Sequence, residues 1–198
     1  MKILDFLGSS LGLIDTLLLV RASVLAWPFG ILAICINIVL YFEVKLYADI
    51  GLQIVYLISS IYGWCYWLYG NNDKKPIAIT HITWSMSLSL LIIGMIGVFL
   101  TDEILILYTP STTPLWDSTT AILSLIAQWL VCRKIIENWL LWLLIDSLYA
   151  GLYYYKGLPF HTMEHTIYLV IAVVGYIVWK KKMDKEPGLK KQELGLAS

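Results

Sequence analysis

The chain has 198 residues, of which 59% are hydrophobic and 14% are charged, and its formal net charge is zero. Soluble domains carry about 25% charged residues, so this composition excludes an ordinary soluble domain, and the charge balance gives no indication of a nucleic-acid partner. The three cysteines lie singly, without the paired CxxC spacing of metal and redox sites. We therefore predict neither a metal nor any other cofactor.

Seven apolar stretches follow one another along the chain, with short polar loops between them. A helix needs about 17–25 apolar residues to cross the hydrocarbon core of a membrane, and the second and fifth stretches are the shortest. In chain order the predicted spans are Leu7–Leu25, Pro28–Phe42, Asp49–Leu68, His81–Leu100, Ser118–Val131, Asn138–Tyr155 and His161–Trp179. The sequence therefore predicts an all-α integral membrane protein that ends in a polar tail, residues 183–198.

The basic residues are divided unequally between the two sides of the membrane that seven crossings define. One side has three, Lys2, Lys45 and Lys156. The other has eleven, namely Arg21, Lys74, Lys75, Arg133, Lys134, Lys180, Lys181, Lys182, Lys185, Lys190 and Lys191. Cytoplasmic loops are enriched in Lys and Arg, so we predict a cytoplasmic C-terminus and an external N-terminus.

The sequence matches itself when it is shifted by 112 residues. The informative matches are Asp5 with Asp117, Arg21 with Arg133, Trp27 with Trp139, Tyr41 with Tyr153, Tyr56 with Tyr168, Gly63 with Gly175 and Trp67 with Trp179. Each copy holds three spans and one span lies between the copies, so the copies run parallel. We predict a three-helix bundle in residues 1–70, a linking helix with its loops in 71–113 and a second bundle in 114–182. Transporters of this plan bind their solute between the halves.

Polar and aromatic residues form stripes on several predicted helices. In the sixth span Trp139, Trp142, Asp146, Tyr149 and Tyr153 are spaced 3, 4, 3 and 4, which places them on one helix face. The third span has a stripe of the same spacing, with Trp64 at its border, and the second and fifth spans add single amides. These further residues are Gln53, Tyr56, Ser60, Gly63, Trp67, Asn37, Tyr41, Ser124 and Gln128.

Each stripe also has a simpler interpretation. Tryptophans at helix ends often form an interfacial belt, which is the interpretation we favour for Trp27, Trp67, Trp116 and Trp179. The amides of Gln53, Asn37 and Gln128 are equally suited to bonding neighbouring helices. For the deeper Trp142, Trp64 and Tyr56 we favour a binding site.

The two acidic residues inside the spans receive different interpretations. A carboxylate in a membrane is costly and is usually functional, so we assign Asp146 to the site. Asp15 has Ala127 as its repeat mate and Arg21 within two turns, so we expect a structural pair there. No histidine or second carboxylate is clearly paired with Asp146, and we therefore expect transport down the solute gradient without a proton relay. His81, His161 and His165 do not form a metal set.

A site of aromatic planes, amides and one carboxylate suits a flat, cationic, heteroaromatic solute. Its faces stack on the rings, where cation–π attraction adds about 0.5–2 kcal/mol. The amides bond its edge, and the carboxylate offsets its charge.

Several motifs resemble those of the PnuC family of nicotinamide riboside transporters. They are the segment 137–142, Glu-Asn-Trp-Leu-Leu-Trp, after Arg133 and Lys134; Leu46-Tyr47-Ala48 with Gln53; Ile61-Tyr62-Gly63-Trp64 with Trp67; and Trp116-Asp117-Ser118. The resemblance runs from about Trp27 to Trp179. It implies two three-helix bundles joined by a linking helix, as in SWEET-type sugar transporters, in a homotrimer of the bacterial inner membrane. It also implies facilitated diffusion of the vitamin, which a cytoplasmic kinase then traps by phosphorylation.

Two positions depart from the resemblance. Nicotinamide riboside carriers have Asn where this chain has Ser60 and Asp146, and thiamin-carrying relatives look more like this chain there. Nicotinamide riboside and thiamin therefore both remain candidate solutes. The candidate binding residues are Asn37, Gln53, Tyr56, Ser60, Trp64, Gln128, Asn138, Trp139, Trp142, Asp146 and Tyr149.

Two other classes of membrane protein were considered. A membrane enzyme needs a nucleophile–base pair, a metal cluster or a phosphate-binding loop, and the sequence has none that is recognisable. A sensor or accessory subunit needs a signalling or docking domain, for which the tail is too short. We therefore predict a transporter.

Overall fold

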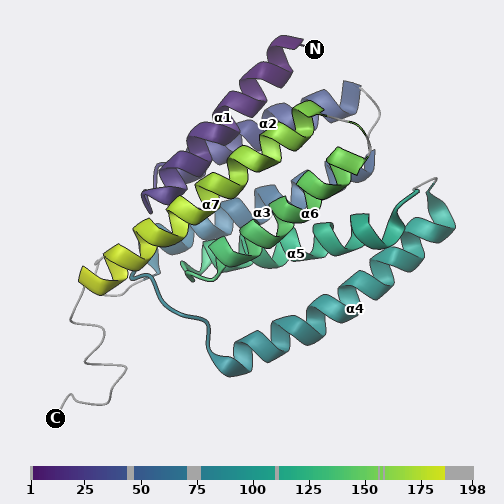
Figure 1. The fold of residues 1–198 in the computed structure, drawn as a ribbon. Coiled ribbons are helices and arrows are strands. Elements are labelled where there is room, and N and C mark those ends of the chain that lie inside the picture. The colour runs from purple at the N-terminus through teal and green to yellow at the C-terminus, as the bar shows by residue number, and fades with distance from the viewer. Residues whose placement is uncertain are drawn as a thin grey trace.

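The computed structural model describes residues 2–43, 47–70, 77–109, 112–155, 157 and 159–185. Within them the chain forms seven helices and an isolated bridge between two loop residues (Figure 1). The helices are α1 (Lys2–Val20), α2 (Ala26–Glu43), α3 (Tyr47–Tyr69), α4 (Trp84–Tyr108), α5 (Pro114–Cys132), α6 (Asn138–Tyr155) and α7 (Pro159–Lys185). The predicted number and order of the helices are confirmed, and α6 has the predicted bounds.

Most other helix bounds differ from the predicted ones by a few residues. The first helix ends at Val20 rather than Leu25, because Ala22 adopts a left-handed conformation with φ of 50°. The seventh continues past Trp179 to Lys185, since lysine is a good helix former and suits a helix C-terminus. The predicted polar tail therefore begins as helix, and residues 186–198 of that prediction lie outside the described residues.

The fourth helix begins at Trp84 rather than His81 and ends at Tyr108 rather than Leu100. The segment before it is extended because it bonds to the turn between α5 and α6. The N–H of Thr80 donates to the Lys134 carbonyl (3.2 Å), and the N–H of Ile136 donates to the Thr80 carbonyl (3.0 Å). The Glu137 carboxylate accepts from the Ile82 N–H at 3.0 Å and pairs with His81 at 2.7 Å. These long-range bonds replace the first predicted turn of helix.

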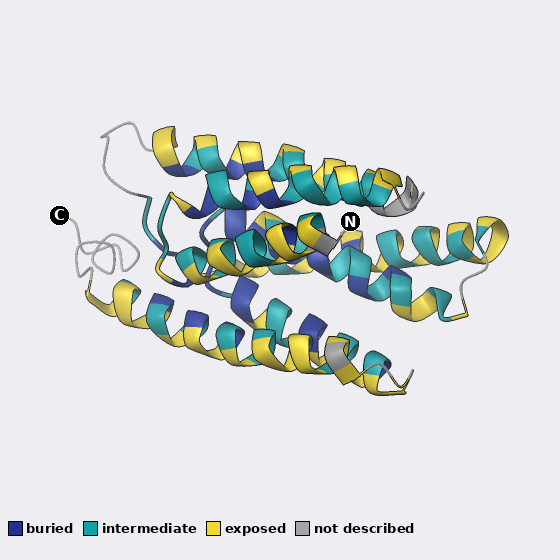
Figure 2. Ribbon diagram, turned by 90° about the horizontal axis from the view of Figure 1, so that it is seen from above, coloured by how far each residue is buried: buried dark blue, intermediate teal, exposed yellow. Residues whose placement is uncertain are grey.

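Many large apolar side chains of the helices are exposed. Figure 2 shows the exposed positions in yellow along the outer faces of the helices. Among the described helices, four are both long and apolar enough to cross a membrane, α2, α4, α5 and α7. The apolar part of α1, Phe6–Val20, is shorter. Helices α3 and α6, which carry the polar stripes, are not among these four. An apolar exterior around a polar interior is the arrangement of a multi-pass membrane protein.

The internal repeat is confirmed by the packing and by the backbone. Helices α1, α2 and α3 pack in sequence, as do α5, α6 and α7, and the two groups meet where α3 packs on α5 and α1 on α7. The linking helix α4 packs mainly on α5 and lies at the edge of the molecule (Figure 1).

The turn after α1 and the turn after α5 have the same hydrogen bonds in the same register. The N–H of Ala22 donates to Leu19 and that of Ser23 to Leu18, while the N–H of Lys134 donates to Val131 and that of Ile135 to Leu130. Ala22 and Lys134 both have positive φ, 50° and 58°. Every one of these residues is shifted by the 112 positions found in the sequence.

Four tryptophans form a buried cluster, so the predicted interfacial belt is wrong for Trp27, Trp67 and Trp179. Their exposed fractions are 3%, 4% and 0%, whereas Trp116 is 38% exposed. Trp27 meets Trp67 edge to face at 5.3 Å, and Trp139 meets Trp179 in the same way at 5.6 Å. Room for the indoles comes from Gly63 and Gly175, where an added Cβ would collide with Trp27 and Trp139 respectively.

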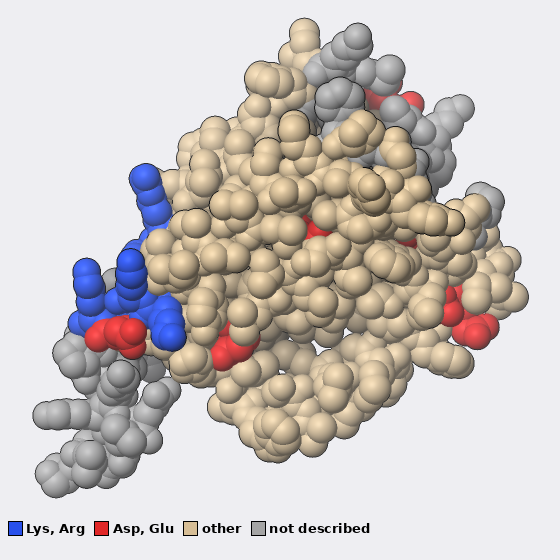
Figure 3. Space-filling view, viewed as in Figure 1, with Lys and Arg blue, Asp and Glu red and all other residues tan. Residues whose placement is uncertain are grey.

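The described Lys and Arg side chains gather at the end of the molecule where α7 terminates (Figure 3). Trp179 Nε1 donates to the Leu19 carbonyl at 2.9 Å, which brings the ends of α1 and α7 together. Lys134 of the α5–α6 turn lies 4.4 Å above the Trp67 ring at the same end. The predicted basic side thus has a counterpart in the fold, although Lys45, Lys74, Lys75, Lys156, Lys190 and Lys191 lie outside the described residues.

Candidate functional site

A cavity of about 340 Å³ lies between the two bundles. Every helix except α4 contributes to its wall. Nine of the eleven predicted residues line it: Asn37, Tyr56, Ser60, Gln128, Asn138, Trp139, Trp142, Asp146 and Tyr149. The other two, Gln53 and Trp64, do not, and Trp64 packs instead against the tryptophan cluster.

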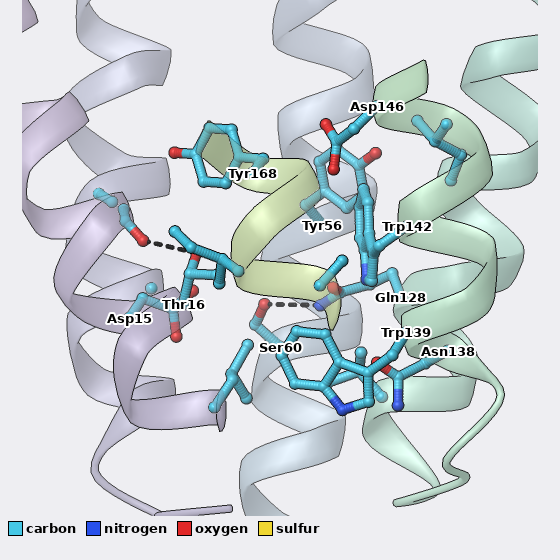
Figure 4. A pocket seen from close by; sticks show the side chains of 18 of the residues that line it. Asp15, Thr16, Tyr56, Ser60, Gln128, Asn138, Trp139, Trp142, Asp146 and Tyr168 are labelled. Carbon is cyan, nitrogen blue, oxygen red and sulfur yellow. Dashed lines mark hydrogen bonds between the residues drawn. The ribbon is translucent and has the colours of Figure 1, made fainter. Parts of the chain in front are cut away.

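One wall of the cavity is the polar stripe of α6 (Figure 4). Asn138 begins this helix and donates from Nδ2 to the Ile135 carbonyl at 2.6 Å. Its Oδ1 is buried and accepts no hydrogen bond from the described residues. A buried acceptor without a donor costs about 1–3 kcal/mol, so a solute N–H that reaches it gains a favourable bond. Trp142, one turn further on, presents its indole to the same space.

Asp146 is paired with His165 of α7, contrary to our expectation that no histidine accompanies it. Asp146 Oδ1 and His165 Nδ1 are 2.8 Å apart, and Asp146 is only 7% exposed. The imidazole stacks on Tyr149 and Tyr153, with ring centroids 4.8 Å and 5.4 Å away. His165 also lines the cavity and so belongs to the candidate site. The sequence analysis did not include this residue in the site.

The internal repeat contains the signal that would have identified His165. Its mate at a shift of 112 is Gln53, and Tyr168, which also lines the cavity, is the mate of Tyr56. The stripe read in the third helix therefore has an equivalent in the seventh. Equivalent faces of a two-fold repeat are directed at the same central space.

The wall opposite Trp142 and Asp146 comes from α1, where Asp15 and Thr16 lie in Figure 4. The predicted ion pair between Asp15 and Arg21 is not formed among the described residues. Helix α1 ends at Val20, so the turn carries Arg21 out of helical register and into an exposed position. The Asp15 carboxylate lies instead against Gly30 of α2, where an added Cβ would be 2.8 Å from Oδ2.

The remaining polar contact of the wall joins α3 and α5. Gln128 Nε2 donates to Ser60 Oγ at 3.3 Å (Figure 4), so the amide both bonds the neighbouring helix and lines the cavity. Together the walls offer an aromatic plane, amide edges and two carboxylates. The volume falls in the range of small-molecule sites, about 300–1,000 Å³, and the groups suit a flat heteroaromatic cation.

Comparison with known proteins gives one family and several relatives. The family described as Nicotinamide mononucleotide transporter matches residues 2–181. The nicotinamide riboside transporter PnuC of Escherichia coli (strain K12) is 25% identical, over 89% of this chain and 84% of the relative. The riboflavin/roseoflavin transporter RibM of Streptomyces davaonensis is 26% identical, over 93% of this chain and 89% of the relative.

A solved structure is also similar. The crystal structure of the vitamin B3 transporter PnuC aligns with a TM-score of 0.72 at 22% identity, over 93% of this chain and 83% of that one. At this identity the similarity is evidence for the fold.

Proposed function

The chain belongs to the nicotinamide mononucleotide transporter family, and from this premise we propose that it carries nicotinamide riboside, a cationic heteroaromatic vitamin, down its gradient into the cell. The resemblance to PnuC drawn from the sequence is confirmed by the family match and the relatives. Those relatives are transporters and not enzymes, so the predicted class is confirmed as well.

The observation that carries the choice of solute is the charge of the cavity. Asp15 and Asp146 line it, and no Lys or Arg does so among the described residues. A positively charged ring that stacks on Trp142 therefore has anionic partners in a poorly hydrated space, where attraction between charges is strong. Riboflavin, which the name of one relative gives as its solute, has a neutral ring system and would leave both carboxylates without a counter-charge.

Thiamin is the second candidate, and two residues favour it. Ser60 and Asp146 stand where the resemblance predicts Asn in nicotinamide riboside carriers. Ser60 is short and already bonded to Gln128, so it leaves more of the cavity to the solute than Asn would. The aminopyrimidine of thiamin also offers an N–H that suits the free Oδ1 of Asn138.

Calorimetry of the purified protein with nicotinamide riboside, thiamin and riboflavin tests the proposal. We expect tight binding of one of the two cations and weak binding of riboflavin. Preference for riboflavin would contradict the cationic class. Preference for thiamin would retain the class and replace nicotinamide riboside as the solute.

We further propose a homotrimer of the bacterial inner membrane with the C-terminus in the cytoplasm, where a kinase traps the solute. The positive end of the fold supports the orientation, because Lys and Arg favour the cytoplasmic side. A reporter fused after Ser198 should be active only in its cytoplasmic form. Activity of an external reporter at the same place would reverse the orientation.

A further inference from the structure

The two carboxylates of the cavity differ in what they already bind. Asp146 accepts the hydrogen bond of His165 at 2.8 Å and is held by that partner at the α6–α7 interface. Among the described residues no hydrogen bond or ion pair reaches Asp15, which lies on the opposite wall. Tyr168 of α7, which also lines the cavity, interacts with it electrostatically. A charge inside a membrane protein needs a partner or water. Among the described residues Asp15 has both carboxylate oxygens available, whereas Asp146 already uses Oδ1 for His165.

The position of Asp15 depends on a glycine. Its Oδ2 and Oδ1 would be 2.8 Å and 3.2 Å from a Cβ at residue 30, so any larger residue there would displace the carboxylate. The other bundle has the opposite combination: Ala127 is the mate of Asp15, and Trp142 is the mate of Gly30. The first bundle thus combines a carboxylate with a glycine, and the second combines an indole with an alanine that does not line the cavity. A flat cation bound between Trp142 and Asp15 would place its ring on the indole and its charge towards the carboxylate.

From this arrangement we infer that Asp15, rather than the His165-bound Asp146, is the solute-binding anion that neutralises a cationic vitamin in this cavity. The inference rests on the proposed function and adds to it the residue that selects for charge. Asp146 then acts as a positioning residue, which fixes His165 and its stacked tyrosines.

The test compares a cation with its neutral analogue. Nicotinamide riboside is paired with its dihydro form and thiamin with deazathiamin, because each pair differs little except in the charge of the ring. Affinities are measured on the wild type, Asp15→Asn, Asp15→Glu and Asp146→Asn. We expect the wild type to prefer the cation at least tenfold. Asp15→Asn should remove that preference and leave the affinity for the neutral analogue within about threefold, and Asp15→Glu should restore part of it.

Asp146→Asn is the matched control, since it removes the other charge from the same cavity. It should change the affinities for cation and neutral analogue by the same factor and so keep the preference. If Asp15→Asn does not fold, Gly30→Ala decides, because it retains the carboxylate but displaces it. Loss of the cation preference in Gly30→Ala supports the inference.

Two results would overturn the inference. A cation preference that persists in Asp15→Asn or, where that variant does not fold, in Gly30→Ala would overturn the role of Asp15 and leave the proposed function in place. A wild type that binds neither cation, or that binds a cation no better than its neutral analogue, would overturn both the inference and the proposed function.

Discussion

The bundle of α1–α3 and the bundle of α5–α7 have the same framework and different walls. Both have the left-handed turn after their first helix, and both pack an indole on a glycine, Trp27 on Gly63 and Trp139 on Gly175. These shared features hold the helices of each half together.

Several positions at which the halves differ face the cavity. Four equivalent pairs, first bundle before second, are Asp15 and Ala127, Gly30 and Trp142, Ile34 and Asp146, and Gln53 and His165. Of these, only Gln53 and Ala127 do not line the cavity. The comparison separates two kinds of residue within one chain: repeated residues such as Trp27 and Trp139 support the fold, whereas the four pairs that differ make the two walls of the cavity unlike.

The largest expected effect concerns the repeated framework. Trp27→Ala and Trp139→Ala each remove a buried indole from a close-packed cluster, and such truncations typically cost about 3–5 kcal/mol. We expect both variants to lose thermal stability by similar amounts, measured as melting temperature in detergent by size-exclusion chromatography. Trp116→Ala, at an exposed position, is the control and should melt like the wild type. A large difference between Trp27→Ala and Trp139→Ala would show that the two halves are not equivalent in packing.

The next effect concerns a wall that is not repeated. Trp142→Ala removes the aromatic plane, and stacking of a base on an aromatic ring contributes about 1–3 kcal/mol. Solute affinity measured by calorimetry should fall accordingly, while the melting temperature of the empty protein changes little. Trp129→Ala removes an exposed indole outside the cavity and should leave affinity intact. Equal affinities for the wild type and Trp142→Ala would place the stacking surface elsewhere.

The smallest effect comes from making one differing pair alike. His165→Gln copies the residue of its mate, Gln53, into the second bundle. Glutamine keeps an N–H for Asp146 but removes the imidazole that stacks on Tyr149 and Tyr153. We therefore expect solute affinity to fall by about 0.5–1.5 kcal/mol, the value of an aromatic pair.

The same variant tests the mode of transport. In liposomes, uptake by the wild type should follow the solute gradient and should not be driven uphill by a pH gradient. Uphill accumulation that disappears in His165→Gln would make the Asp146–His165 pair a coupling site and would contradict facilitated diffusion.

The fold could be predicted from the sequence because membrane helices are set by apolar length, which is a local property. The seven helices and their order followed from it, and the repeat followed from matches such as Trp67 with Trp179. The start of α4 could not be predicted, since the segment before it is held extended by Lys134, Ile136 and Glu137, all more than fifty residues away. The left-handed turn at Ala22, which ends α1 early, also lacks the glycine that usually marks it.

The site could be predicted where a stripe identified a helix face, which placed Trp142 and Asp146 correctly on the cavity. It could not be predicted where a residue lies at the margin of that face, or where its partner comes from another helix. Gln53 has the right spacing and Trp64 borders the stripe, yet neither lines the cavity. His165 was considered only as a metal ligand, and Asp15 was assigned to Arg21 by proximity in sequence, although the helix ends between them.

The peripheral position of α4 has an evolutionary consequence. A three-helix unit that pairs with an identical copy must place every side chain twice about the axis, so its cavity can only be symmetric. Direct fusion of two such units would insert the second one upside down, and α4 supplies the extra crossing that prevents this. Because it packs mainly on α5, it adds the crossing without entering the centre. After fusion each half mutates independently, and a carboxylate on one wall can face an indole on the other. A solute with no symmetry of its own then has a site that no pair of identical halves could offer.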